Sequence, residues 1–211
     1  MSLSKGFAFA AFSDRTLASI FDMKRYIILI VASVLIINAY SQRVGVEGLI
    51  GYSAMVVPTN GPFINGVQIS ILSNFYPPKA SFFSFTTGIV FQNENEWNFL
   101  KVPVKLTFLI GKKVTFLFGG GLAGNYVMLP KESYNKYGII SKSDFTLNGM
   151  IFLGFSVNII KNWKIKFIPE YESSLTTLYK SFGGRHGYDY EKYHSISFNL
   201  GVIYIFNNIK N

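Results

Sequence analysis

Hydrophobic and polar residues alternate along most of the chain that follows Gln42. In the clearest stretch, one set of alternate positions is apolar, namely Leu100, Val102, Val104, Leu106 and Phe108, and the other set is Lys101, Pro103, Lys105 and Thr107. A two-residue period indicates a β-strand whose two faces meet different surroundings. The pattern recurs in eight segments, at 43–55, 65–73, 82–92, 97–109, 113–127, 145–160, 163–175 and 194–206.

The lengths of these segments and of their connections favour a membrane barrel. Several segments exceed the five or six residues that are usual for strands, and they suit the roughly 9–11 residues with which a tilted strand crosses a bilayer. Short periplasmic turns and longer external loops are typical of outer-membrane barrels. Here short connections at 74–79, 111–112 and 161–162 alternate with others that include long ones at 128–144 and 176–193, although the connection at 92–96 is unexpectedly short. We therefore predict an all-β fold, an eight-stranded antiparallel up-and-down transmembrane β-barrel over 42–211, in the outer membrane with both termini periplasmic.

Side-chain volume decides which face of each strand points inward. About five bulky apolar residues on each of eight strands are too many for the narrow lumen of such a barrel. We therefore expect the apolar face to contact lipid and the opposite face to line the lumen with small residues: Gly45, Gly51, Ser70, Ser84, Gly88, Gly119, Gly121, Ala123, Gly154, Ser156, Ser197 and Gly201. Aromatic residues near the segment ends are expected to form interfacial girdles: Trp97, Phe108, Tyr126, Trp163, Tyr204 and Phe206.

Proline and glycine interrupt the alternation at three places. Pro103 and Pro169 lie inside predicted strands, where proline cannot donate to the hydrogen-bond ladder, so we expect a β-bulge at each. The run Gly119-Gly120-Gly121 is expected to let its strand bend or to admit a bulky neighbour. A phosphate-binding loop is disfavoured because no helical pattern follows this run.

The N-terminal region reads as an export signal. Met23-Lys24-Arg25 is followed by an apolar run from Tyr26 to Ile37 and by small residues at Ala39 and Ser41. A basic segment, a short apolar core and small residues before the cleavage point define a signal peptide, and the run is shorter than a membrane span. We predict a signal peptide at 23–41, translation from Met23, and 1–22 as an upstream extension.

Composition narrows the possible chemistry. Only 15% of the 211 residues are charged and 49% are hydrophobic, whereas soluble domains carry about 25% charged residues. The chain has no cysteine and two histidines, which excludes disulfides and thiolate chemistry and leaves little room for a metal site. The net charge of +9 comes from scattered residues, so we expect no nucleic acid, cofactor or metal.

Charged residues also fall on the predicted lumen face: Glu47, Lys101, Lys105, Lys164, Lys166, Glu170 and Glu172. An unpaired charge in a narrow interior costs several kcal/mol, so we expect these residues to pair and to fill the lumen. An ion path or proton relay is the functional alternative. Because an eight-stranded barrel is too narrow for an aqueous channel, we do not expect an open pore.

Two other functions compete with a structural or interaction role. A lipid-modifying hydrolase is suggested by His194, Ser195 and Ser197 near Asp189 and Glu191. However, His194 and Ser197 fall on opposite strand faces and Ser195 points away from His194, so the spacing does not indicate a nucleophile within reach of its base. We therefore predict no catalytic residues. The other alternative is a soluble lipocalin-like barrel that binds small apolar ligands.

The two longest connections carry the remaining candidates for binding. The aromatic residues of 176–193, which are Tyr179, Phe182, Tyr188, Tyr190 and Tyr193, form either a recognition surface for a protein partner or a cap over the barrel mouth. Basic residues there are placed to meet lipopolysaccharide phosphates: Lys131, Lys136, Lys142, Lys180, Arg185 and Lys192. Glu132, Asp144, Asp189 and Glu191 dilute their field.

The segment from Phe99 to Leu106, followed by a tight turn and the Gly-rich strand around Phe118 to Gly121, resembles outer-membrane β-barrel proteins of the PorT-like type. The resemblance covers about 42–206 and implies an exported eight-stranded barrel, in a family whose members mostly have no assigned activity and of which one is associated with a protein-secretion apparatus. The chain departs from such barrels in the tail 207–211, because they often end on an aromatic residue such as Phe206.

Overall fold

A computed structural model describes residues 43–56, 63–77, 82–134, 139–182 and 188–206 of the chain. Eight long strands make up most of this part: β1 (Arg43–Val56), β2 (Phe63–Tyr76), β3 (Phe83–Glu94), β4 (Trp97–Gly111), β5 (Val114–Met128), β7 (Phe145–Ile160), β8 (Trp163–Ser174) and β11 (His194–Phe206). Their bounds lie within three residues of those that the alternation predicts. In the described ranges, no helix has both the length and the apolar character of a membrane-spanning helix.

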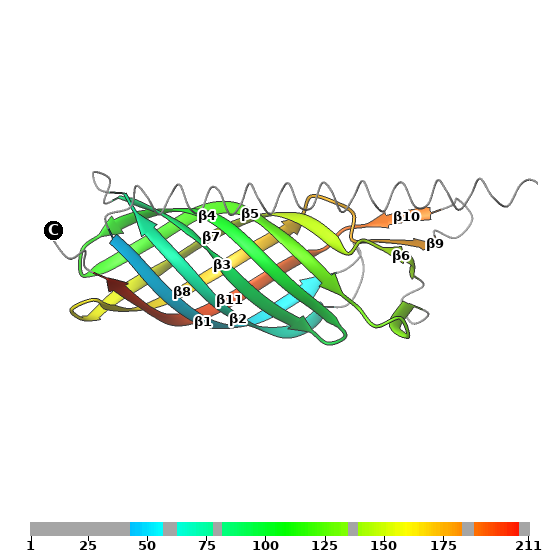
Figure 1. Ribbon diagram of the computed structural model, residues 1–211, viewed down its shortest axis with the longest axis horizontal. Coiled ribbons are helices and arrows are strands. Elements are labelled where there is room, and N and C mark those ends of the chain that lie inside the picture. The colour runs from blue at the N-terminus through cyan, green and yellow to red at the C-terminus, as the bar shows by residue number, and fades with distance from the viewer. Residues whose placement is uncertain (1–42, 57–62, 78–81, 135–138, 183–187, 207–211) are drawn as a thin grey trace, which may run out of the picture. The chain divides into compact units, whose positions relative to one another are not determined.

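The eight long strands form a closed antiparallel barrel in the order β1-β11-β8-β7-β5-β4-β3-β2 (Figure 1). Each long strand pairs with the next long strand along the chain, and the barrel closes where β1 pairs with β11, from Val44 opposite Phe206 to Val56 opposite His194. Lipid chains cannot hydrogen-bond to backbone N–H and C=O groups. Closure pairs both edges of every long strand, so no strand edge is left facing lipid. The predicted eight-stranded up-and-down barrel is confirmed.

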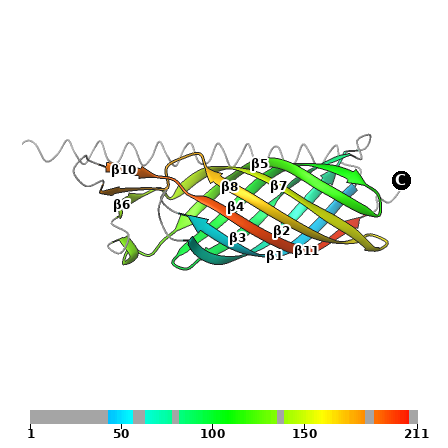
Figure 2. The same cartoon turned by 180° about the vertical axis from the view of Figure 1, so that it is seen from behind.

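The connections place tight turns at one end of the barrel and longer connections at the other. The turns at 112–113 and 161–162 lie at the end where β1 begins and β11 ends, which we call the short-turn end. The opposite end, which we call the loop end, carries the connections at 129–144 and 175–193 and also the two-residue turn at 95–96. Figure 2 shows the short-turn end on the right.

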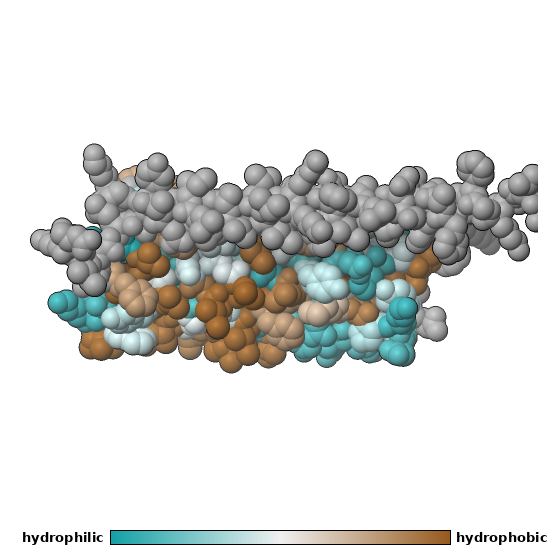
Figure 3. Space-filling view, in the orientation of Figure 1, coloured by the Kyte–Doolittle hydropathy of each residue, from teal (hydrophilic) through white to brown (hydrophobic). Residues whose placement is uncertain are grey.

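The apolar face of the strands forms the outside of the barrel. On β4, Leu100 is 41% exposed while Lys101 is 3% exposed, and on β7, Ile151 is 63% exposed while Phe152 is 6% exposed. On the face of the molecule drawn in Figure 3, hydrophobic residues gather over the middle of the barrel and hydrophilic residues toward its ends. The predicted assignment of faces is therefore confirmed.

The lumen holds more apolar side chains than the small-residue pattern predicts. Gly51, Ala123 and Ser156 are buried there as expected, but two apolar clusters also cross the interior: Leu49 with Leu72 and Val90, and Leu117 with Phe152 and Ile168. Glycine makes room for some of these. A Cβ on Gly119 would lie 2.8 Å from the Phe152 ring and 2.0 Å from the Leu106 carbonyl oxygen, so the glycine run admits a bulky neighbour.

The prediction of a β-bulge at each strand proline is wrong. The β3–β4 register is the same on both sides of Pro103, since Thr87 lies opposite Val104 and Val90 opposite Lys101, and only the intervening pairs are missing. The β7–β8 register is likewise unchanged across Pro169. Each missing N–H therefore costs a local gap in the ladder and not an extra residue.

The girdle prediction is wrong for Trp97. Its side chain is 1% exposed and points into the barrel, because it shares the parity of Lys101, which lines the lumen. Tyr126, Trp163 and Phe206 lie on the outside as predicted, and Phe108 and Tyr204 are partly exposed there. Trp163 packs against Tyr204 with ring centroids 5.0 Å apart at the short-turn end.

A second sheet that alternation does not predict lies in the two longest connections. It consists of β6 (Ile139–Lys142), β9 (Tyr179–Phe182) and β10 (Tyr188–Glu191), in the order β10-β9-β6. The connections at 129–144 and 175–193 are thus joined to one another beyond the barrel (Figure 1). The predicted extension at 1–22, the signal peptide at 23–41 with its start at Met23, and the tail 207–211 lie outside the described residues.

Candidate functional site

Three ion pairs cross the lumen and use six of the seven predicted charges. Lys101 of β4 pairs with Glu172 of β8, Lys105 of β4 pairs with Glu170 of β8, and Lys166 of β8 lies 2.9 Å from Glu47 of β1. All six residues are buried. The predicted pairing is confirmed for them. The seventh residue, Lys164, is half-buried and makes no ion pair within the part of the chain that the structure describes.

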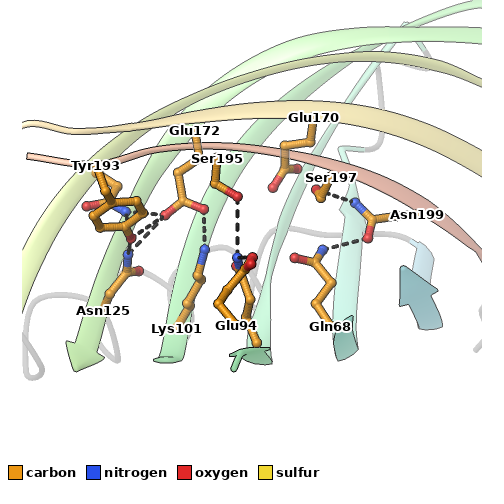
Figure 4. Close-up of polar contacts among 12 residues, drawn as sticks. Gln68, Glu94, Lys101, Asn125, Glu170, Glu172, Tyr193, Ser195, Ser197 and Asn199 are labelled. Carbon is orange, nitrogen blue, oxygen red and sulfur yellow. Dashed lines mark hydrogen bonds and ion pairs between the residues drawn. The ribbon is translucent and has the colours of Figure 1, made fainter. Parts of the chain in front are cut away.

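Glu172 is the centre of the polar cluster nearest the loop end (Figure 4). In addition to the Lys101 ammonium, it accepts hydrogen bonds from Asn125 Nδ2 at 2.9 Å, from Asn148 and from the Tyr193 hydroxyl at 3.2 Å. Asn125 also donates to the Tyr193 oxygen, at 2.6 Å. Burial raises the pKa of Tyr193 well above its usual value, and the Glu172 carboxylate raises it further. The hydroxyl therefore stays protonated and can donate.

A second cluster lies toward the short-turn end. Asn74 Nδ2 donates to Glu47 Oε2 at 2.7 Å, and the hydroxyl of Thr86 donates to Asn74 Oδ1 at 2.7 Å. Between the two clusters, Gln68 donates to Asn199 at 2.6 Å, and Asn199 donates to Ser197 at 3.0 Å. The sequence reasoning missed the amide side chains, although their lumen parity is readable from the same alternation.

The lumen between these clusters is nearly filled. The cavity beside the Lys105–Glu170 pair has a volume of about 10 Å³, and a single water molecule needs at least about 10–15 Å³ by the same measure. A hydrated ion is larger than one water molecule, so it does not fit this cavity. The geometry fits a structural ion-pair network better than an ion path.

An aromatic cluster closes the lumen at the loop end. Trp97 stacks on Phe99, with ring centroids 6.4 Å apart, and on Tyr179 at 5.7 Å, while Tyr193 packs on Phe99 at 5.2 Å. Other buried side chains complete the cluster, namely Met55, Val127, Leu129, Ile139 and Leu178. We call these nine residues the aromatic cap. The aromatic loop residues are predicted to form either a recognition surface or a cap over the barrel mouth, and Tyr179 and Tyr193 are part of a cap. The side chains of Phe182, Tyr188 and Tyr190 lie outside the described residues.

The candidate hydrolase residues do not come together. His194 is exposed, and its Nδ1 lies 2.8 Å from the hydroxyl of Tyr171, whose ring stacks on the imidazole. Ser195 and Ser197 are 3% and 5% exposed and point into the lumen. Histidine and serines thus lie on opposite faces, as predicted, and no nucleophile–base pair forms among them. No group of metal ligands occurs within the described ranges.

The loop end carries charges of both signs. Lys142 pairs with Asp144, and Lys131, Glu132 and Lys192 are exposed. Lys180 and Glu191 are half-buried. Lys136 and Arg185, and the side chain of Asp189, lie outside the described residues. This mixture agrees with the expected dilution of the positive field.

No family model and no curated protein matches the sequence. Solved structures do match the fold. Neisserial surface protein A is 10% identical with a TM-score of 0.56, covering 77% of this chain and 97% of that one. The outer membrane protein OprG of Pseudomonas aeruginosa is 10% identical with a TM-score of 0.49, covering 80% and 98%. The attachment invasion locus protein Ail of Yersinia pestis is 17% identical with a TM-score of 0.44, covering 79% and 99%.

The likeness to Neisserial surface protein A, the one of these with a TM-score above 0.5, bears on the class of fold. The described chain is a closed eight-stranded antiparallel β-barrel of the outer-membrane type, as the likeness to Neisserial surface protein A and the barrel's own topology both show. An outer-membrane location agrees with this fold and with the apolar exterior of the strands. The PorT-like resemblance finds no matching family model and stays a prediction.

Proposed function

We propose that this protein is an integral outer-membrane barrel that conducts no ions and catalyses no reaction, and that it acts as a structural or interaction protein through its loop end. We place the loop end outside the cell and the short-turn end in the periplasm, because outer-membrane barrels have long external loops and short periplasmic turns. Assignment to the PorT-like type is part of the proposal and rests on the strand motif at 99–106.

One observation carries the proposal: the apolar face of the strands is outside, and the lumen is packed with three buried ion pairs, amide side chains and two apolar clusters. A lipocalin-like binder needs an apolar cavity large enough for its ligand, typically about 300 Å³ or more, whereas the lumen cavity here is about 10 Å³. This cavity therefore offers no room for such a ligand. The sheet of β6, β9 and β10 beyond the mouth, whose Ile140 is 42% exposed, is left as the part that a partner can reach.

Planar bilayer recording tests the closed lumen. We expect no stable unit openings from the purified, refolded protein, because the ion pairs and the aromatic cap leave no continuous water. A variant that opens the lumen, Trp97→Gly with Phe99→Gly, serves as a positive control for incorporation if it raises the conductance. Large, regular openings from the unmodified protein would refute the proposal.

Site-specific photocrosslinking in intact cells tests the interaction role. A photoreactive residue at Ile140 of β6 is expected to capture a protein or lipopolysaccharide outside the cell, whereas one at Lys113 in a short turn reports the periplasmic side. Adducts of the same species from both positions would contradict the proposed orientation. No adduct from several positions of the small sheet would contradict the interaction role.

A further inference from the structure

Exposed lysines gather at the short-turn end of the barrel. Lys112 and Lys113 form the β4–β5 turn, Lys161 begins the β7–β8 turn, and all three are exposed. Asn158 of β7 ties the two turns together, because its backbone N–H donates to the Lys113 carbonyl at 3.2 Å and its side chain to the Lys112 carbonyl at 3.1 Å. The two turns lie side by side in both views of the barrel (Figures 1 and 2). We call these three lysines the basic rim.

No carboxylate offsets the basic rim in the part of the chain that the structure describes. The described residues of the turns at this end include no Asp or Glu. Glu47 lies toward this end but is 0% exposed and is paired with Lys166 inside the lumen. Half-buried Lys164 adds another positive charge close to the rim. The loop end differs, since acidic residues there lie among the lysines.

The basic rim borders the apolar exterior directly. Ile110 and Phe116 flank the first turn and are 60% and 62% exposed, and Ile160 precedes the second turn and is 64% exposed. Trp163, 42% exposed, follows the second turn on the same outer surface. Tryptophan prefers the level of the lipid headgroups, and lysine stems extend along apolar surface while the ammonium stays in water. The rim therefore lies at the depth of the headgroup phosphates.

We infer that the basic rim binds acidic phospholipids of the adjoining leaflet through their phosphate groups, and so concentrates these lipids around β4, β5, β7 and β8. Charge complementarity and depth indicate the occupant. The ammonium groups, which have no carboxylate beside them among the described residues, lie next to lipid-facing isoleucine and tryptophan, and this combination matches a lipid whose acyl chains end in an anionic headgroup. This inference rests on the proposed insertion of the barrel in a membrane. Each lysine is expected to raise the local preference for an acidic lipid by at most about fivefold.

Quenching of Trp163 fluorescence by spin-labelled lipids measures that preference. Trp97, the only other tryptophan, is buried in the lumen and is 1% exposed, so it is shielded from lipid. In vesicles of phosphatidylcholine, spin-labelled phosphatidylglycerol is expected to quench Trp163 more strongly than spin-labelled phosphatidylcholine does. The difference is expected to shrink in about 1 M salt, where the Debye length is about 3 Å.

The matched variants separate the rim from the net charge. Lys112→Gln with Lys113→Gln and Lys161→Gln is expected to remove most of the preference, whereas Lys131→Gln with Lys192→Gln, at the loop end, is expected to keep it. Equal quenching by the two lipids in the unmodified protein would overturn the inference, and it is the result expected if the rim binds an acidic protein instead. An unchanged preference in the rim variant would also overturn it. If neither lipid quenches Trp163, the barrel is not inserted and the proposed function fails instead.

Discussion

Removing the Glu172 carboxylate is expected to destabilise the barrel more than any single change at an exposed ion pair. Glu172→Gln keeps the side-chain volume but leaves the Lys101 ammonium, 3% exposed, without its anionic partner. Breaking a buried pair in this way costs about 3–5 kcal/mol, because the remaining charge is desolvated and uncompensated. The amide also loses acceptor capacity that Asn125, Asn148 and Tyr193 now use.

Equilibrium unfolding by guanidinium in phospholipid vesicles, followed by tryptophan fluorescence, provides the free energy of unfolding. The double variant Lys101→Met with Glu172→Gln is expected to be more stable than Glu172→Gln alone, since it removes the Lys101 ammonium that the single variant leaves unpaired. Asp144→Asn is the matched control, because Asp144 is 74% exposed and pairs with Lys142; it is expected to cost less than about 1 kcal/mol. A loss no larger in Glu172→Gln than in Asp144→Asn would refute the reasoning.

The remaining predictions concern the exterior, the lumen backbone and the cap. Leu153→Arg, at a lipid-facing position that is 66% exposed, is expected to cost about 2–4 kcal/mol in vesicles, and an unchanged stability there would contradict a lipid-facing β7. Gly121→Ala is expected to cost about 1–3 kcal/mol, because its Cβ would lie 2.2 Å from the Val104 carbonyl oxygen, whereas Gly48→Ala, with nothing within 4 Å, is expected to stay within about 0.5 kcal/mol of the parent. Tyr193→Phe is expected to cost about 1–3 kcal/mol at neutral pH. The folded-state pKa of Tyr193 is raised above its ordinary value of 10.0, so the protonated hydroxyl stabilises the fold fully below pH 10 and less as the pH rises above it. Tyr193→Phe is expected to lack this decrease in stability at alkaline pH. Measuring the free energy of unfolding as a function of pH tests this.

Alternation alone predicts most of the fold. Its two-residue period indicates strands, and because the lumen is too narrow for the bulky apolar side chains, the apolar face of each strand has to point outward. The parity that places Leu100 outside and Lys101 inside continues along β4, and the same rule held for all eight strands. The position of Trp97 near a segment end suggests the girdle, whereas its parity with Lys101 indicates the lumen. The proline bulges failed for another reason, because a barrel can accept a missing hydrogen bond where a register shift would turn every following side chain to the other face.

Other features depend on contacts that no local pattern contains. β6 and β9 have four residues each, and they pair only because the connections at 129–144 and 175–193 leave the barrel close together. The partners of Glu172 come from β4, β5, β7 and the residue before β11, so its cluster requires the closed barrel and its register. Sequence therefore indicated that the lumen charges pair, but not which lysine meets which glutamate.

Cysteine scanning of β4 tests the central claim most directly, since the chain has no cysteine of its own and each substitution yields a single labelling site. A fluorophore is attached at each position from 100 to 107, and its quenching by lipids that carry a spin label within the acyl chain is measured in vesicles. Strong quenching at Leu100, Val102, Val104 and Leu106, with weak quenching at the positions between them, is the result predicted here. Uniform quenching, or strong quenching at Lys101 and Lys105 instead, would contradict an apolar exterior around a polar lumen.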